Sequence, residues 1–282
     1  DDFPSYKEKI AKSGGTPTYT RPCCTADLKI KDTKSLTKDI SNLKSALKKN
    51  NHSQGFINSA SPGVISNFLP NKFYKNDDDY LEALSKMMKT EYDEITKNDL
   101  FLQIDCPDLA LARHMTFKKV SDEEFLVRAE KQIECLNEAI KDIDSSKLRM
   151  HICWGNYEGP HIHDIGLEKI LPIALKANIQ TYLIEASNPR HAHEWTVFRD
   201  RKSEIPDDKI LVPGVVDTTT NFIEHPELVA ERINKFVNIV GKERVIAGSD
   251  CGFGTFAGFG AVDPDIAFAK LKSLSEGALI AS

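Results

Sequence analysis

The sequence predicts an α/β protein built on one parallel sheet. From about residue 60 onward, short apolar runs rich in Val, Ile, Leu and Phe alternate with longer amphipathic segments. This order is typical of parallel strands joined by crossover helices. A doubly wound sheet would usually carry a glycine-rich phosphate turn after its first strand, and the sequence has none. We therefore expect a (β/α)8 barrel of the TIM type.

The predicted strands are apolar runs without strict alternation, which fits strands covered on both faces. We count seven where a complete barrel has eight. The first strand is therefore expected either to precede Asp1 or to lie in the N-terminal segment. The seven predicted strands are Cys23–Ile30, Gly63–Phe68, Leu100–Ile104, Leu148–Cys153, Gln180–Ile184, Ile210–Val216 and Val245–Gly248.

Amphipathic segments between these strands predict the helices. Apolar residues recur every three or four positions, and Ser121 with Glu124 forms a capping box before the second helix. The predicted helices are Tyr80–Lys97, Phe125–Ile143, Gly166–Lys176 and Pro226–Val240. The lysine-rich Thr33–Asn51 and the polar Asn71–Asp79 are expected to be solvated helix and loop. Since the chain has no internal repeat, we expect residues 1–282 to form a single domain.

The composition argues against several classes of function. Lys and Arg total 37 against 42 Asp and Glu, and a mildly acidic surface disfavours nucleic-acid binding and anionic membranes. The apolar runs fall far short of the roughly 20 residues that span a bilayer, and the acidic opening Asp1-Asp2 does not predict a secretory leader. Six scattered cysteines are too few for a disulfide scaffold. We therefore expect reduced thiols in a cytoplasmic protein.

Four residues of metal-ligand type lie at three predicted strand ends: His151, Cys153, Glu185 and Cys251. The C-terminal ends of barrel strands share one face, so these side chains can meet. Alternation along a strand sends His151 and Cys153 to the same side, roughly 6–7 Å apart, which lets both reach one metal. One nitrogen, two sulfurs and one oxygen suit tetrahedral zinc.

Such a centre favours chemistry at sulfur. Two thiolates and a carboxylate around Zn²⁺ leave a formal charge near minus one, which makes the metal a weak Lewis acid toward carbonyls. It can still bind an incoming thiol as a nucleophilic thiolate, which predicts alkyl transfer to sulfur. Taken singly, however, Cys153 or Cys251 is more often a buried small residue, and Glu185 could pair with an arginine.

The same residues resemble the catalytic domain of cobalamin-independent methionine synthase. The resemblance rests on His151-Ile-Cys153, Glu185 and Ser249-Asp250-Cys251-Gly252, and it extends from about residue 20 to the C-terminus. It implies a catalytic zinc held by His151, Cys153, Glu185 and Cys251. Leu102–Asp105 followed by Pro107 is similar to the family strand whose aspartate contacts the amino group of homocysteine, which implies that role for Asp105.

Two further segments look like the short, single-domain branch of this family, which includes epoxyalkane:coenzyme M transferase. They are Cys153–Pro160 and Glu185–His191. We expect the chain, like that branch, to lack the N-terminal barrel that full-length synthases use in folate binding. It also carries Thr219 where the synthases have a histidine that assists proton transfer. Threonine does not titrate near neutral pH, so the resemblance implies that this relay is absent or supplied elsewhere.

Several further residues near these strand ends are candidates for acid–base chemistry or substrate binding. His191 or His193 is expected to supply the acid or base that Thr219 cannot. Arg190 either binds an anionic substrate group or neutralises the acidic site. The other candidate substrate contacts are Trp154, Asn156, Ser187 and Thr219.

The loop after the His-x-Cys strand carries His161, His163 and Asp164, with three interpretations left open: a second metal site, a substrate-contacting loop, or a helix N-terminus capped by Asp164. Asp250 is expected to orient a ligand. Phe253–Gly260 is expected to be a flexible loop at the barrel mouth, and its glycine spacing does not match a phosphate-binding loop.

The sequence therefore predicts a zinc-dependent S-methyltransferase or alkyltransferase with a small-molecule thiol acceptor and an alkyl donor. By the resemblance, homocysteine is the first acceptor expected and methionine biosynthesis the setting. One alternative is an alkyl or epoxide transferase or lyase that uses a different thiol. Another is a non-catalytic homologue stabilised by zinc. The sequence carries no prediction of oligomeric state.

Overall fold

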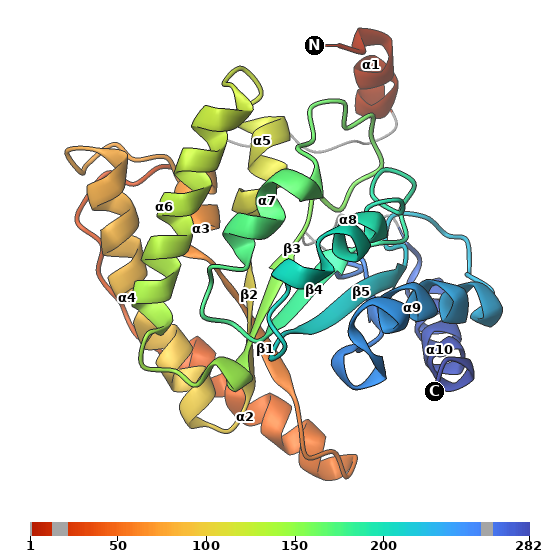
Figure 1. The fold of residues 1–282 in the computed structure, drawn as a ribbon. Coiled ribbons are helices and arrows are strands. Elements are labelled where there is room, and N and C mark those ends of the chain that lie inside the picture. The colour runs from red at the N-terminus through yellow and green to blue at the C-terminus, as the bar shows by residue number, and fades with distance from the viewer. Residues whose placement is uncertain (1, 13–21, 255–261) are drawn as a thin grey trace.

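The computed structural model describes residues 2–12, 22–254 and 262–282, and in these ranges it contains one six-stranded parallel sheet. Neighbouring strands follow chain order, so each crossover returns to the next position in the sheet (Figure 1). The strands are β1 (Phe56–Ala60), β2 (Phe101–Asp105), β3 (Leu148–Ile152), β4 (Thr181–Glu185), β5 (Ile210–Val216) and β6 (Gly248–Ser249).

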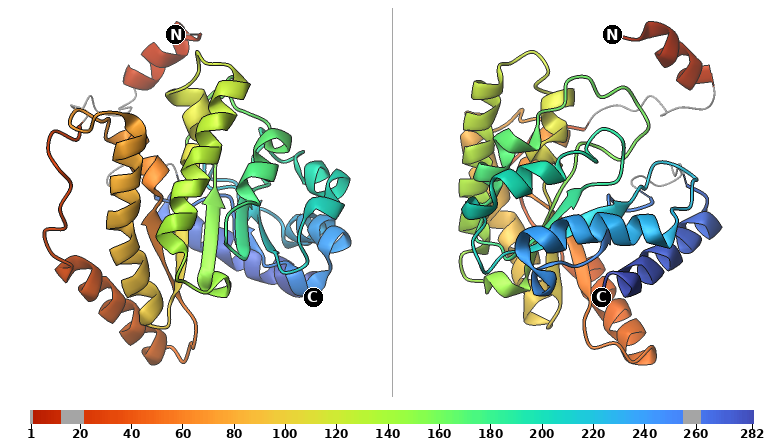
Figure 2. Two further views of the ribbon diagram at one scale, coloured as in Figure 1. Left: turned by 60° about the vertical axis from the view of Figure 1, so that its left-hand side comes forward. Right: turned by 45° about the vertical axis from the view of Figure 1, so that its right-hand side comes forward.

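Helices surround the sheet in chain order, from α4 beside β1 and β2 to α9 and α10 beside β5 (Figures 1 and 2). They are α1 (Pro4–Lys12), α2 (Lys34–Lys49), α3 (Pro62–Phe68), α4 (Asp77–Lys97), α5 (Leu111–Met115), α6 (Asp122–Ile140), α7 (Leu167–Ala174), α8 (Trp195–Asp200), α9 (Pro226–Val240) and α10 (Pro264–Ile280). None of these helices has the length and apolar character needed to cross a bilayer.

The predicted α/β class is confirmed, and β2 to β5 lie where the apolar runs predicted them, to within one residue at each end. The capping box before α6 is also confirmed: the Ser121 side chain accepts from the Glu124 N–H, and the Glu124 carboxylate accepts from the Ser121 N–H. The lysine-rich segment forms α2, as expected. The sheet is a curled partial barrel, with six of the eight strands that a complete barrel would have.

Two predicted strands were wrong. Gly63–Phe68 is most of helix α3, because Ser61 caps its N-terminus by accepting from the Val64 N–H and Pro62 occupies the first helical position. The strand of this unit is instead β1, whose sequence FINSA did not predict a strand because two polar residues interrupt its short apolar run and it is only partly buried. Cys23–Ile30 forms no strand: its one sheet-like contact is an isolated bridge between Cys24 and Asn71.

The last predicted strand is displaced and shortened. Val245 makes only an isolated bridge to Leu211, and β6 begins at Gly248, where Gly248 pairs with Gly214. The register then shifts before the second pair, between Ser249 and Val216. Most of Phe253–Gly260, the expected loop at the barrel mouth, lies outside the described residues. The missed helix α10 packs on α9.

The main core lies between the sheet and the helices. Ile104, Met150 and Ile184 are buried on successive strands, against helix residues such as Ile133 and Leu136 of α6. Parallel pairing aligns Asp105 with His151 and Glu185 with Gly214. The C-terminal ends of the strands therefore lie at one edge of the sheet, which is where the chemistry-bearing residues meet.

Candidate active site

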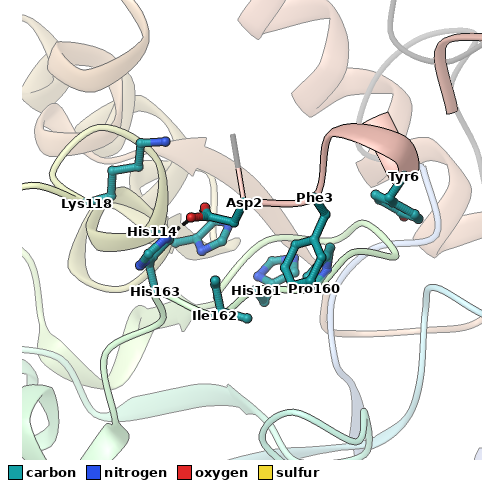
Figure 3. Close-up of a pocket in the computed structure, with 9 residues that line it drawn as sticks. All are labelled: Asp2, Phe3, Tyr6, His114, Lys118, Pro160, His161, Ile162 and His163. Carbon is teal, nitrogen blue, oxygen red and sulfur yellow. Dashed lines mark hydrogen bonds and ion pairs between the residues drawn. The ribbon is translucent and has the colours of Figure 1, made fainter. Parts of the chain in front are cut away.

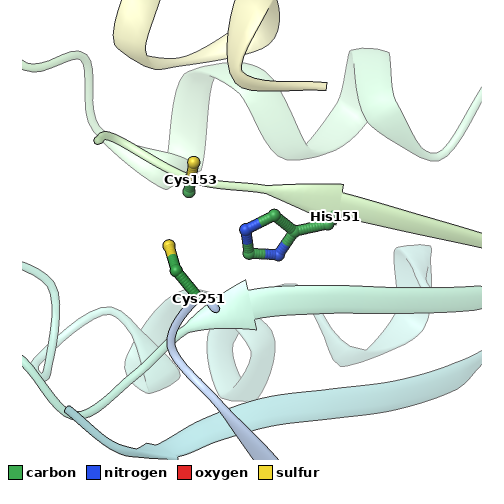
Figure 4. A group of neighbouring side chains, drawn as sticks. All are labelled: His151, Cys153 and Cys251. Carbon is green, nitrogen blue, oxygen red and sulfur yellow. The ribbon is translucent and has the colours of Figure 1, made fainter. Parts of the chain in front are cut away.

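The structure brings three of the four predicted metal ligands into one cluster. His151 and Cys153 come from the end of β3, and Cys251 comes from the turn after β6 (Figure 4). One ligand atom from each of these side chains lies within 4.8 Å of the others. All three residues are buried, with exposed fractions of 8–9%. Residues about one hundred positions apart therefore converge on a water-poor site that contains two sulfurs and an imidazole.

Glu185, the fourth predicted ligand, lies beside this cluster at the end of β4. Its Oε1 is 3.6 Å from Cys251 Sγ and accepts a hydrogen bond from the Trp154 backbone N–H at 3.0 Å. The side chain is almost completely buried. Burial raises the pKa of Glu185 to about 8, and the neighbouring Cys153 and Asp250 add to this increase. An added cation would therefore strongly favour its ionised form.

A hydrogen bond between the two cysteines shifts their pKa values in opposite directions. A hydrogen bond from the Cys251 thiol and the nearby His151 hold the pKa of Cys153 well below its ordinary value, although burial opposes this. The same hydrogen bond raises the pKa of Cys251, and burial adds to the increase. Burial alone would lower the pKa of His151, but Cys153 raises it to about 9. The arrangement thus concentrates negative charge at the Cys153 sulfur.

Asp250 organises the loop that follows β4. Its Oδ1 accepts from the backbone N–H groups of Ala186 and Ser187, at 2.9 and 3.0 Å. Its Oδ2 accepts from both the backbone and side-chain nitrogens of Asn188, at 2.9 and 3.0 Å. Gly214 of β5 makes room for this contact, since a Cβ there would lie 2.4 Å from Asp250 Oδ1. Asp250 therefore connects the Cys251 turn to the Glu185 loop.

Asn188 is a site residue that the sequence analysis missed. Its Nδ2 donates to Glu185 Oε2 at 2.8 Å as well as to Asp250. Its position three residues after Glu185, in the same strand-end loop, was the available signal.

Asp105 ends β2, next to His151 of β3. Its Oδ2 accepts from Asn58 at 3.4 Å, whereas its Oδ1 is buried without a hydrogen-bond partner among the described residues. Burial raises the pKa of Asp105, and His151 partly opposes this. A buried, unpartnered carboxylate oxygen costs about 1–3 kcal/mol. Asp105 is thus ready to accept a hydrogen bond from a bound polar group.

Arg190 and His191 surround Glu185 with positive charge. Arg190 donates to Glu185 Oε2 at 3.3 Å and to the Gly155 carbonyl at 3.2 Å. His191 contacts Glu194 through Nδ1 at 2.9 Å and Asp164 through Nε2 at 3.1 Å. Burial alone would lower the pKa of His191, but these two carboxylates raise it to about 9. His191 is therefore a fixed cation with both ring nitrogens occupied.

The other candidate substrate contacts are engaged by neighbouring residues near the cysteine cluster. Trp154 is fully buried, donates from Nε1 to the Ile165 carbonyl and stacks on His191 with ring centroids 3.9 Å apart. Asn156 donates to the Gly252 carbonyl at 2.6 Å and accepts from Thr218 at 2.7 Å, which connects three strand-end loops.

The hydroxyl groups of Thr219, after β5, and Ser187, after β4, differ in whether they have a hydrogen-bond partner. Thr219 donates to Asp217 within its own turn at 2.9 Å. Ser187 has a buried hydroxyl without a hydrogen-bond partner among the described residues.

Of the three interpretations of the histidine-rich loop after β3, the helix cap by Asp164 is wrong. The N-cap of α7 is Gly166, and Asp164 instead contacts His161 and His191. His163 pairs with Asp2 at 3.1 Å, and His193 is exposed. His114 of α5, which the sequence analysis did not single out, lies 3.6 Å from Asp164.

Comparisons with known proteins were consistent with one another. A family model described as the catalytic domain of cobalamin-independent synthase matches residues 3–265. The methionine synthase of Saccharolobus solfataricus is 30% identical over 224 residues, which cover 78% of this chain and 56% of that protein. The 2-hydroxypropyl-CoM lyase of Xanthobacter autotrophicus is 26% identical over 171 residues, which cover 52% and 44% respectively. The chain thus spans about half the length of these curated relatives.

A solved structure has the same fold. It is a B12-independent methionine synthase from Shewanella sp. W3-18-1 in complex with selenomethionine. The match has a TM-score of 0.66 at 19% sequence identity and covers 94% of this chain and 69% of that one. At this identity the likeness concerns the fold alone.

Proposed function

The chain belongs to the family of cobalamin-independent synthase catalytic domains, and on this premise we propose that it transfers a methyl or other small alkyl group to the sulfur of a small thiol, with zinc as its cofactor. The observation that carries the proposal is the convergence of His151, Cys153 and Cys251 to within 4.8 Å beside the buried Glu185. The likeness in fold supports the further proposal that the six-stranded sheet is part of an eight-stranded barrel.

The donor set fits zinc. Thiolate and imidazole ligands together select zinc over hard cations such as Mg²⁺. Glu185 Oε1, 3.6 Å from Cys251 Sγ, is close enough to serve as the fourth donor. Its other oxygen is already held by Asn188 and Arg190, which fixes the direction of the carboxylate. When bound, zinc would hold the acceptor sulfur as a thiolate at neutral pH.

Asp105 supplies the recognition of the acceptor in this proposal. Its Oδ1 is buried and unpartnered on the strand beside His151, so an ammonium group on the acceptor would satisfy it. Homocysteine carries an ammonium group and a thiol, and it is therefore the first acceptor that we propose. The role places the protein in methionine biosynthesis.

His191 acts in this proposal as a positioning residue. Both of its nitrogens are bonded to carboxylates, and its pKa is about 9, so it holds its proton at neutral pH. With Trp154 stacked on it, the ring supports the loop that follows Cys153. Arg190 balances the charge of Glu185 rather than lying free for substrate.

A second candidate function is the same chemistry on a different thiol. The relative named 2-hydroxypropyl-CoM lyase favours it, and so does Thr219, which stands where the resemblance to the synthases implies a histidine. In that case the enzyme would be an alkyl or epoxide thiol transferase, or a lyase acting in the reverse direction.

Metal analysis of matched cysteine variants tests the centre. Cys153→Ser and Cys251→Ser should each remove one equivalent of zinc per chain and abolish thiol alkylation. Cys135→Ser is the control, because Cys135 is a buried cysteine of α6 outside the site. If both site variants keep the full zinc content of the wild type, the ligand assignment is wrong.

A matrix of acceptors and donors separates the candidate reactions. Homocysteine and coenzyme M would each be supplied with a methylfolate, a methylated corrinoid or an epoxide, and S-alkylated product measured by mass spectrometry. Product with homocysteine supports the synthase proposal, and product with coenzyme M alone supports the second candidate. If no product forms, the protein would be substituted with cobalt and its spectrum recorded with and without added thiol. An unchanged spectrum would indicate a closed, non-catalytic site.

A further inference from the structure

A second cluster of metal-ligand type lies outside the cysteine centre. His114 comes from α5, and His161 and Asp164 come from the loop between β3 and α7. One ligand atom from each residue lies within 4.8 Å of the others. The two imidazole rings stack nearly parallel, with centroids 4.7 Å apart and planes 14° apart. Segments distant in the chain therefore present two imidazoles to one carboxylate.

Hydrogen bonding leaves this cluster incompletely satisfied. His161 Nδ1 lies 3.2 Å from Asp164 Oδ2, whereas His114 Nδ1 lies 3.6 Å from Asp164 Oδ1, which is too long for a hydrogen bond. Within the described part of the chain, His114 Nδ1, which faces the carboxylate, is buried and has no hydrogen-bond partner. His161 Nε2, the nitrogen of that ring not in contact with Asp164, is also buried and unpartnered. The His161 side chain is 0% exposed, so bulk water does not compensate.

Two of the three donor separations suit one shared metal ion, and the third, between the two imidazoles, is within 4.8 Å. With metal–nitrogen and metal–oxygen bonds of about 2.0–2.2 Å, two donors of a tetrahedral ion lie about 3.4 Å apart. The distances from His161 and His114 to the Asp164 carboxylate, 3.2 and 3.6 Å, lie on either side of this value. Imidazole ligands favour late first-row transition metals, whereas Ca²⁺ and Mg²⁺ prefer oxygen alone.

The two oxygens of the Asp164 carboxylate have different neighbours. His161 Nδ1 lies between them, 3.3 Å from Oδ1 and 3.2 Å from Oδ2. His191 and Arg190 both contact Asp164 Oδ2, while Oδ1 faces His114.

We propose that His114, His161 and Asp164 form a second metal site, which takes a divalent first-row transition metal of the zinc class. Its ligands are nitrogen and oxygen only, unlike those of the cysteine centre. A pocket of about 190 Å³ lies beside the cluster, and His114, His161 and His163 are among the residues that line it (Figure 3). The bound ion would fasten α5 to the loop that leads from β3 into α7.

Cobalt titration of metal-free protein tests this site independently of the proposed function. Cobalt bound by thiolates shows strong near-ultraviolet charge-transfer absorption, and cobalt bound by nitrogen and oxygen does not. We expect the wild type to bind two equivalents, of which only one develops this absorption. His114→Phe keeps an aromatic ring against His161 but removes the nitrogens, and it should bind one equivalent with the charge-transfer band intact.

Two further variants complete the test. The double variant Cys153→Ser/Cys251→Ser should retain the equivalent without charge-transfer absorption, which shows the second site even if His114→Phe fails to fold. His52→Ala removes an exposed histidine and should still bind two equivalents. A single equivalent in the wild type that carries the charge-transfer band, or two equivalents in folded His114→Phe, would overturn the second site. Wild-type protein that binds cobalt without any charge-transfer band would instead count against the cysteine centre.

Discussion

Replacing Asp250 with asparagine tests how the strand-end loops of the cysteine centre hold one another in place. The Asp250 carboxylate accepts four hydrogen bonds of 2.9–3.0 Å, from the backbone nitrogens of Ala186, Ser187 and Asn188 and from Asn188 Nδ2. Asparagine has the same shape but only one acceptor oxygen. In either orientation of the amide, its NH₂ group faces two N–H donors, so two of the four bonds are lost.

The expected cost follows from these bonds. A hydrogen bond to a charged group contributes about 1.5–3 kcal/mol, so the loss of two amounts to roughly 3–6 kcal/mol. Part of this is offset, because burial raises the pKa of Asp250 and the neutral amide avoids that penalty. We therefore expect Asp250→Asn to lower the free energy of unfolding by about 2–4 kcal/mol, and the Tm by about 4–8 °C.

The metal centre should weaken as well. Asn188 Nδ2 bridges Asp250 and Glu185, so disturbing it removes a restraint on the fourth proposed ligand. Zinc affinity, measured by competition with a chromophoric chelator, should fall about 10- to 100-fold. Asp207→Asn is the matched control, because Asp207 is fully exposed and its pairing with Arg244 lies on the surface. The free energy of unfolding of this variant should differ from that of the wild type by less than about 0.5 kcal/mol.

The reasoning would be refuted by an Asp250→Asn protein that unfolds at the wild-type urea concentration and binds zinc with wild-type affinity. Loss of stability with unchanged zinc affinity would confine Asp250 to a structural role. Both measurements are therefore needed on the same preparations.

Three further changes probe other parts of the structure. Burial raises the pKa of Asp108 to about 6, so the folded state holds this proton more tightly than the unfolded chain does. The free energy of unfolding should therefore fall by on the order of 3 kcal/mol as the pH rises from about 4 to about 6. Asp108→Asn should abolish this fall in urea titrations. Gly214→Ala should lower the free energy of unfolding by about 1–3 kcal/mol, measured by thermal unfolding, because its methyl group would lie 2.5 Å from the Cα of Asp250. A variant as stable as the wild type would show that β5 and the Asp250 turn can move apart at little cost. Lys270 is buried and paired with Glu224 at 2.8 Å, so Lys270→Met should cost about 3–5 kcal/mol and the double variant Lys270→Met/Glu224→Gln much less; equal losses in both would contradict this.

The sequence was sufficient where local pattern and structure agree. Strands such as Ile210–Val216 are buried on both faces, so their apolar runs marked them directly. Helix α6 could be located because its period and its capping box are local features. It failed for α3, since a seven-residue apolar segment fits a helix or a strand equally well. It also failed for β1, a short, half-exposed strand at the edge of the described sheet in which Asn and Ser interrupt the apolar run.

By itself, the sequence determined the parallel α/β class and placed His151, Cys153, Glu185 and Cys251 at strand ends, because residue type and period are properties of short segments. Only the tertiary structure decided that three of them meet within 4.8 Å while Glu185 lies beside them. It alone revealed that Asp250 and Asn188 hold the loop and that His114 faces Asp164. These contacts join loops far apart in the chain, and their geometry depends on how the whole sheet curls and packs.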